Sequence, residues 1–316
     1  MNVSMSAQRA CLSEDRWHFQ HGPIDIVIGA HGDAAAIRQA HEAAWQRFET
    51  VLEELVRELP MLRRAIPCGA PLPSADKALD GAIAQRMWNA CTPYRAGFIT
   101  PMAAVAGAVA QELIASYARP GIERAWVNNG GDIALHLTPG QSVRVGLFAD
   151  LAHWEAALND VDSNSEGAEG ITTDAQCEIE FEMPVRGIAT SGWRGRSFSL
   201  GIADSVTVLA QTSAMADAAA TVIANAVNVA NPNIVRRPAS ELRDDSDLGS
   251  ILVTVDVPRL SDGDIRSALA AGQHKAQSLA ARGLIESAVL VCQGQFVQAS
   301  RWDRSNRNIF QYSLTT

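Results

Sequence analysis

The chain has 316 residues, of which 47% are hydrophobic and 19% are charged, a composition typical of a globular protein with one or two buried cores. Its formal net charge of -9 argues against a broad nucleic-acid or anionic-membrane surface, because both require clustered Lys and Arg. No window has the roughly 18 apolar residues without charge that a membrane helix requires, so no membrane partner is expected.

The cysteine pattern favours a reducing compartment. The five cysteines are odd in number and none forms a C-x-x-C pair, so neither a disulfide framework nor a structural zinc site is expected. The first residues also lack the basic and apolar segments of an export signal. We therefore expect a cytoplasmic protein with free thiols at Cys11, Cys68, Cys91, Cys177 and Cys292.

The first third of the chain is predicted to be mainly helical. Alternating apolar and polar residues over 17–28 predict an N-terminal hairpin. Apolar residues at spacings of three and four then predict a long helix that begins after Asp33 and ends at Pro60. Residues 76–91 form a second predicted helix. A third begins at Pro101 and is rich in small residues, which allow another backbone or a ligand to approach closely.

The remainder mixes strands and helices. Strands are predicted at 124–137 (two, around a turn), 143–148, 177–183, 185–189, 206–210, 251–257, 287–292 and 295–300, with helices at 213–229 and 261–282 and polar segments at 159–170 and 231–249. The absence of regular βαβ alternation favours an α+β fold, with layered mixed or antiparallel sheets, over a Rossmann fold. We expect one domain over residues 1–316, in which 231–316 completes the core.

Three polar clusters stand out as candidate sites. The first is the sequence Asn-Asn-Gly-Gly-Asp at 128–132, between two predicted strands. Paired glycines permit positive φ and expose backbone N–H groups to a ligand, but the same residues are typical of a plain hairpin turn. The second is the segment 187–201, whose glycines, hydroxyls and arginines supply donors for a phosphate or carboxylate, or form an ordinary polar loop.

The third cluster lies on the predicted helix 213–229. Asp217, Thr221 and Asn225 are four residues apart and therefore share one face of that helix. A carboxylate, a hydroxyl and an amide are hard oxygen ligands of the kind that Mg²⁺ prefers, although the stripe could equally face water. Asp204 is a further nearby carboxylate whose role the spacing does not assign.

Taken together and in order, these clusters resemble the motifs of the ApbE (FAD:protein FMN transferase) superfamily. In its flavin transferases a glycine-rich segment precedes a helix, a strand ends in Asn-x-Gly-Gly, and a Thr-Ser-Gly and an Ala-Asp-Ala-x-Ala-Thr helix follow. The counterparts here are residues 98–107, 128–132, 190–192, and 206–208 with 216–221, so the resemblance covers residues 90–230.

The resemblance implies an ApbE-like α+β fold, FAD bound as a substrate, and Mg²⁺ at its diphosphate. Asp217 and Thr221 match the metal-binding Asp and Thr of the family, and a backbone carbonyl within 103–106 would complete that site. Asp217, Asp204 and Ser191 are the candidates for catalysis. The expected ligand-binding residues are Met102, Asn129, Gly130, Gly131, Asp132, Thr190, Ser191, Gly192, Ser197, Ser199 and Gly201.

The chain departs from the flavin transferases in two places. Its segment 101–107 has no lysine, and residues 196–204 stand where the family has a His and an Asp-Pro-x-Thr-Gly sequence. With these differences, the chain resembles a cytoplasmic side branch of the superfamily.

Three functions follow as expectations. The first is an enzyme that binds a phosphorylated or anionic small molecule, FAD being one candidate, together with Mg²⁺; its donors would include the helix that begins at Pro101, whose dipole favours an anion. The second is an FAD:protein FMN transferase that attaches FMN to a threonine of an acceptor protein. The third is a non-catalytic flavin or nucleotide binder. The sequence leaves the oligomeric state open, including a homo-oligomer.

Overall fold

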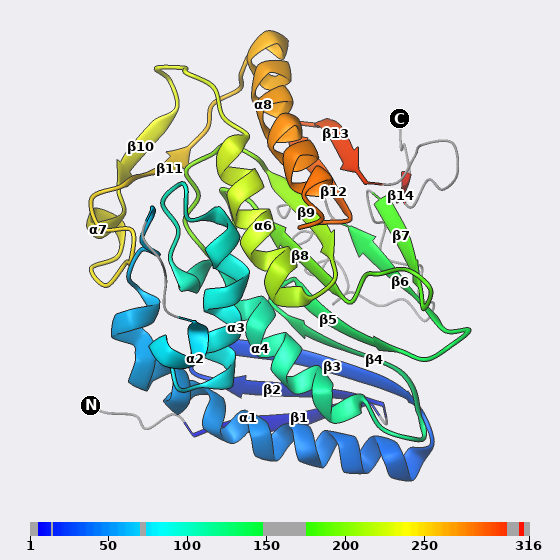
Figure 1. Ribbon diagram of the computed structural model, residues 1–316. Helices are drawn as coiled ribbons and strands as arrows, with labels where there is room; N and C mark the ends of the chain where they lie inside the picture. Colours follow the sequence, from blue (N-terminus) through cyan, green and yellow to red (C-terminus); the bar gives the residue numbers. More distant parts are fainter. Residues whose placement is uncertain (1–5, 14, 70–73, 148–174, 302–309, 313–316) are drawn as a thin grey trace, which may run out of the picture.

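The protein has a layered α+β architecture in which helices cover one face of a large antiparallel sheet (Figure 1). The computed structural model describes residues 6–13, 15–69, 74–147, 175–301 and 310–312. The predicted polar loop at 159–170 lies outside these residues. Within them, no helix is both long enough and apolar enough to cross a membrane.

The main sheet contains strands from both ends of the chain. Among the described residues it has nine strands in the order β1-β2-β3-β4-β5-β8-β9-β12-β13, each antiparallel to its neighbours. Their bounds are β1 Gln8–Ser13, β2 Arg16–His21, β3 Ile24–Gly32, β4 Ile122–Asn129, β5 Asp132–Leu137, β8 Gly187–Ser191, β9 Ser205–Ala210, β12 Ser287–Cys292 and β13 Gln295–Ser300.

The helices pack in sequence order across this sheet. The long helix α1 (Ala34–Leu62) contacts β2 and β3, α4 (Val105–Ile114) contacts β4 and β5, α6 (Ser213–Ala226) contacts β8 and β9, and α8 (Asp262–Ala281) contacts β12 and β13. The shorter helical segments are α2 Ala75–Ala78, α3 Ala82–Cys91, η1 Thr92–Tyr94, η2 Pro101–Ala104, η3 Ala115–Tyr117 and α7 Ala239–Leu242.

Two small sheets complete the described structure. One contains β14 (Phe310–Tyr312), β7 (Ala175–Glu180) and β6 (Ser142–Leu147), and the other pairs β10 (Val235–Pro238) with β11 (Leu252–Asp256). Apolar residues of β6 and β7 form a second core with the main sheet, on the side away from the helices. All six residues of the central strand β9 are consequently buried, as expected for a strand covered on both faces.

The α+β prediction is confirmed, and several local predictions need correction. Pro60 does not end the first helix but lies inside its last turn, and α1 continues to Leu62. The predicted helix over 76–91 is two helices, α2 and α3, separated at residues 79–81. The helix predicted to begin at Pro101 starts as the 3-10 segment η2, and α4 begins only at Val105. The polar segment 231–249 contains the strand β10 and the short helix α7.

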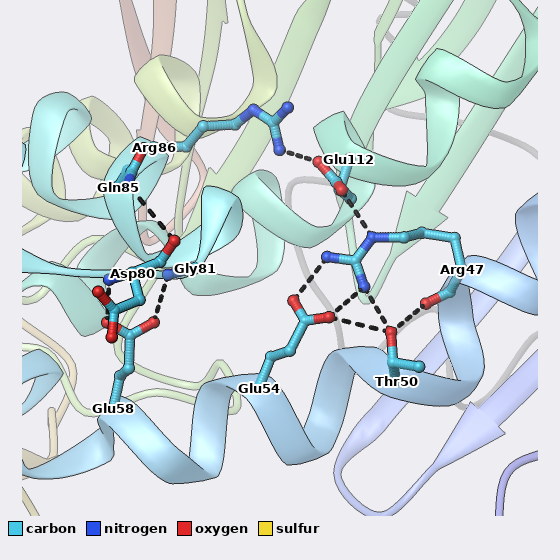
Figure 2. Close-up of polar contacts among 9 residues, drawn as sticks. All are labelled: Arg47, Thr50, Glu54, Glu58, Asp80, Gly81, Gln85, Arg86 and Glu112. Atoms are coloured by element: carbon cyan, nitrogen blue, oxygen red, sulfur yellow. Dashed lines mark hydrogen bonds and ion pairs between the residues drawn. The ribbon is translucent and has the colours of Figure 1, made fainter. Parts of the chain in front are cut away.

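The break between α2 and α3 has a partner on α1. Both carboxylate oxygens of Glu58 accept hydrogen bonds from the backbone of the break, from Asp80 N–H at 2.8 Å and from Gly81 N–H at 2.7 Å (Figure 2). Gly81 is the N-cap residue of α3 and has no side chain to cap it. Glu58 therefore pairs the N–H groups of the N-cap residue of α3 and of the residue before it, and so joins the break between the two helices to α1.

Candidate functional site

The start of α4 lies between two of the candidate clusters, the 128–132 sequence and the polar face of α6. The backbone N–H of Gly107 donates to Oδ2 of Asp217 on α6 at 2.9 Å, and Asn129 Nδ2 at the end of β4 donates to the carbonyl of Ala106 at 3.1 Å. A Cβ atom on Gly107 would lie 2.3 Å from the carbonyl oxygen of Ser213. The small residues of α4 thus let α6 approach closely, which brings Asp217 to the glycine-rich segment.

The cluster at 128–132 forms a two-residue hairpin turn between β4 and β5. Asn129 pairs with Asp132, and the intervening Gly130 and Gly131 have φ values of 66° and 105°. Gly131 N–H donates to Oδ1 of Asn128 at 2.9 Å. The hairpin prediction is therefore confirmed. The ligand hypothesis stays open beside it, because the space above Gly131 contains no atom within 4 Å of a Cβ built there.

Asp132 is the most unusual polar residue of the site. Its side chain is only 8% exposed, and among the described residues its Oδ1 is buried without a hydrogen-bond partner. Burial and the neighbouring charge of Asp217 raise the pKa of Asp132 well above its usual value, against the opposing effects of the Thr190 backbone and Arg196. A buried carboxylate with an unused oxygen is costly unless a proton or a cation accompanies it.

Asp217 is close enough to Asp132 for its charge to raise the pKa of that residue. Burial raises the pKa of Asp217 to about 7, although hydrogen bonds from the backbone of Gly107 and Ala106 favour the ionised form. Thr221 lies one turn further along α6 and is half-buried. Cys91, at the end of α3, is close enough for the charge of Asp217 to add to the effect of burial in raising its thiol pKa.

The end of β8 lies beside this carboxylate pair. Thr190 is exposed and its hydroxyl shares a hydrogen bond of 2.9 Å with Thr207 on β9, while Ser191 is half-buried. Gly192 packs against the backbone, since a Cβ there would lie 2.2 Å from the carbonyl oxygen of Asp204. Met102, on η2, is half-buried against the main core.

Asn225, the third member of the polar stripe on α6, holds a loop. Its Oδ1 accepts hydrogen bonds from Leu200 N–H at 2.8 Å and from the Ser199 hydroxyl at 3.3 Å. Ser199 is buried, and Gly201 lies against the end of α6, where a Cβ would be 2.0 Å from the carbonyl oxygen of Ala224. Ser197, by contrast, is exposed. The contacts of Asn225 and Ser199 are those of residues that fix the loop after β8.

Asp204 likewise has protein partners for both oxygens. Oδ1 accepts from the Trp193 indole N–H at 3.2 Å, and Oδ2 accepts from the backbone N–H of Gln293 in the turn between β12 and β13. These bonds join the loop after β8 to that turn. The carboxylate is therefore engaged in positioning two loops, and we leave it out of the proposed ligand site.

Sequence reasoning did not single out Arg196, which the structure places over the β4–β5 turn. Its Nη2 donates to the carbonyl of Pro23 at 2.6 Å, and its Nη1 lies 2.9 Å from the position of a Cβ on Gly130. The one sequence signal was the presence of arginines in the polar loop, which identifies donors but not their target.

The donor set is compatible with a divalent cation held by few protein ligands. Among the described residues no three His, Cys, Asp or Glu side chains form a metal-binding cluster, so a site composed only of such groups is not present there. Mg²⁺ commonly uses one or two carboxylates and completes its shell with water and substrate phosphate. The pair Asp132 and Asp217, with the hydroxyl of Thr221 nearby on α6, fits that requirement.

All five cysteines, each within the described residues, are free thiols.

A family model matches most of the chain, and individual relatives match about half of it. A family model described as AbpE bacteria matches residues 9–298. The UPF0280 protein of Methanopyrus kandleri is 36% identical over 171 residues, which are 54% of this chain and 60% of that protein. The UPF0280 protein of Methanospirillum hungatei is 33% identical over 154 residues, 48% of this chain and 55% of that protein. The chain thus spans less than two thirds of the length of either relative.

Among solved structures, the chain aligns with the crystal structure of Pseudomonas stutzeri flavinyl transferase ApbE in its apo form. The alignment has a TM-score of 0.41 and 13% sequence identity, and it covers 95% of this chain and 96% of that one.

Proposed function

The chain belongs to the AbpE bacteria family, and from this premise we propose that it is an enzyme that binds a phosphorylated or anionic small molecule together with Mg²⁺. Family membership supports a flavin-related function in general terms, which makes FAD the first ligand to test. The proposed site comprises the β4–β5 turn, the end of β8 and the Asp217 face of α6.

The unpartnered Oδ1 of Asp132 is the observation that carries this proposal. Two carboxylates in one buried environment repel each other, so they require either a shared proton or a positive ion. Asp132, Asp217 and Thr221 would hold the Mg²⁺ ion. Once bound, that ion would supply the positive charge that compensates both carboxylates and the phosphate groups of a ligand.

The remaining residues of the site suit a ligand that lies along the protein backbone. Gly130 and Gly131 present no side chain, and the space above Gly131 is open. Thr190 and Ser191 carry hydroxyl groups that can donate to ligand oxygen atoms. We propose Ser191 as the hydroxyl nearest to the chemistry, because it directly follows Thr190 at the end of β8 and is not fully exposed.

Transfer of FMN from FAD to a threonine of an acceptor protein is the second candidate function, and family membership is the observation that favours it. The two candidates share a ligand site and differ in the fate of the ligand. A non-catalytic flavin or nucleotide binder would occupy the same site without turnover. Incubation with FAD, Mg²⁺ and candidate acceptor proteins, followed by mass spectrometry, separates transfer from binding.

The experiment that tests the proposal is isothermal titration with FAD in the presence and absence of Mg²⁺. We expect micromolar binding that weakens by about tenfold or more without Mg²⁺ and that Asp217→Asn makes independent of Mg²⁺. Asp256→Asn is the matched control, because Asp256 is an exposed aspartate on β11 outside the site.

Two results would contradict parts of the proposal. Binding that depends equally on Mg²⁺ in Asp217→Asn and in the unchanged protein would exclude the cation site. Absence of FAD binding, combined with absence of any thermal shift from phosphorylated or carboxylated metabolites, would exclude the ligand site itself.

A further inference from the structure

The guanidinium group of Arg196 is anchored by a hydrogen bond at one end and lies over Gly130 of the candidate site at the other. On one side Nη2 donates to the carbonyl of Pro23, in the turn between β2 and β3, at 2.6 Å. On the other side Nη1 lies over Gly130, only 2.9 Å from where a Cβ would be. Glycine at position 130 therefore has two roles: it permits the positive φ of the turn, and it leaves room for the arginine.

The charge of Arg196 acts on the carboxylate pair. Its charge lowers the pKa of Asp132, although burial and Asp217 outweigh this effect and leave the pKa raised. Binding of a divalent cation requires both carboxylates to be ionised, and the two aspartates and Arg196 then sum to one negative charge before the charge of the cation is counted. A divalent cation, if bound by these residues, would change that sum to one positive charge, which attracts an anion.

We propose that Arg196 is the anion-recognition residue of this site and that its ligand carries a phosphate ester or diphosphate group. A guanidinium group has five N–H donors in a fixed plane and matches two phosphate oxygens at once, a geometry that a lysine does not reproduce. Because Nη2 is anchored on Pro23, the group is already oriented before a ligand arrives. Because a bound cation makes the net charge of the site positive, we expect the cation and the anion to bind with positive cooperativity. This inference rests on the proposed function, because it requires the cation site at Asp132 and Asp217.

The test measures two probes separately, Mn²⁺ alone and inorganic pyrophosphate with and without Mn²⁺, on the full chain. For Arg196→Met we expect pyrophosphate affinity to fall by about tenfold or more, since hydrogen bonds to charged groups are strong, while Mn²⁺ affinity stays the same or rises. Arg194→Met is the matched control: it removes an equal charge from the same exposed loop, where Arg194 stacks on Trp193. It should leave both affinities within about twofold.

A glycine pair supplies a second, independent test. Gly130→Ala would place a methyl group against Nη1 of Arg196 and displace the guanidinium, so pyrophosphate affinity should fall severalfold. Gly140→Ala imposes a similar backbone strain, because Gly140 has a φ of 80°, but a Cβ there has no atom within 4 Å. That control should lose stability comparably and keep its pyrophosphate affinity.

The outcomes separate this inference from the proposed function. If Mn²⁺ does not bind the unchanged protein, the cation site fails and the cooperative part of the inference fails with it. If Mn²⁺ binds as proposed but Arg196→Met and Arg194→Met affect pyrophosphate equally, only the role of Arg196 is wrong. Pyrophosphate binding that is no tighter in Mn²⁺ overturns the cooperativity.

Discussion

Asp132, which is buried, and the partly buried Asp217 make the stability of this protein depend on pH in an unusual direction. An aspartate in the unfolded chain has a pKa near 3.8, whereas burial raises the pKa of Asp217 in the folded chain to about 7. The folded state therefore holds the proton more tightly. The contribution of Asp217 to stability is greatest below the unfolded pKa and is lost as the pH rises through about 7.

Replacement by an uncharged isostere should remove this dependence. Without divalent cation, Asp217→Asn should be more stable than the unchanged protein at pH 8, by at least about 1 kcal/mol, and similar to it near pH 4. Urea unfolding at both pH values measures the difference, and added Mg²⁺ should narrow it. Equal stability of the two proteins at pH 8 would show that Asp217 is ionised at little cost.

The sequence predicted which polar residues share one face of α6, but not the residues that they contact. Helical spacing placed Asp217, Thr221 and Asn225 on one face, but it gave no reason to expect that Asn225 binds the backbone of Leu200. Arg196 was missed for a similar reason, since its partner Pro23 is 173 positions away in the chain. Spacing rules describe neighbours within an element, whereas these contacts depend on how distant loops are brought together.

At the scale of elements, an acidic residue on α4 joins three helices. Glu112 accepts a hydrogen bond from Nε of Arg47 on α1 at 2.7 Å and another from Nη1 of Arg86 on α3 (Figure 2). Arg47 also forms an ion pair at 2.7 Å with Glu54, which lies seven residues further along α1. Burial opposes ionisation of Glu112, but the hydrogen bonds and charges of the two arginines outweigh it and lower its pKa.

Removal of the charge of Glu112 should loosen the packing of α3 and α4 on α1. The side chain of Glu112 is 14% exposed, so Glu112→Gln would leave two partly buried guanidinium groups short of a partner. We expect a loss of about 1–3 kcal/mol in the free energy of unfolding, measured with urea at pH 7. The pKa of Glu112 is 4.5 in the unfolded chain and lower in the folded protein, so the stability that its ionised form contributes should decline as the pH falls below 4.5.

An exposed ion pair is the control. Arg237 and Glu241 are four residues apart at 3.4 Å, and each side chain is more than half exposed. Glu241→Gln should therefore cost no more than about 0.5 kcal/mol. Equal effects of the two substitutions would contradict the interpretation that the partly buried Glu112 holds α1, α3 and α4 together through its two arginine partners.

Long elements followed from local patterns, while their ends and breaks depended on tertiary contacts. Apolar spacing predicted α1, other local sequence features predicted α6 and α8, and all three helices pack on the sheet. The break between α2 and α3 was not predicted, since the acceptor for its backbone N–H groups is Glu58 on another helix. Pro60 was expected to end α1, yet the helix runs two residues further.

At the scale of the whole molecule, the main sheet joins the last third of the chain to the first. Single-sequence reasoning predicted an α+β fold but not the strand order, because the pairing of β9 with β12 spans a long excursion through β10, α7, β11 and α8. That residues 231–316 belong to one folding unit with the rest remains a prediction. It has a direct physical consequence: β3 and β12 should unfold together although four other strands lie between them.

A cavity in β12 tests this prediction. Leu290 is fully buried and pairs with Val206 on β9, so Leu290→Ala should cost about 2–5 kcal/mol. If the chain is one cooperative unit, hydrogen exchange by mass spectrometry should accelerate by the same factor in peptides from β3 and from β12. Phe296→Ala on β13, where the residue is 44% exposed, is the control and should change exchange little in either peptide. Acceleration confined to residues 252–300 would instead identify this region as a separately unfolding lobe docked against β9, and the Asp204–Gln293 contact would then be an interface between units.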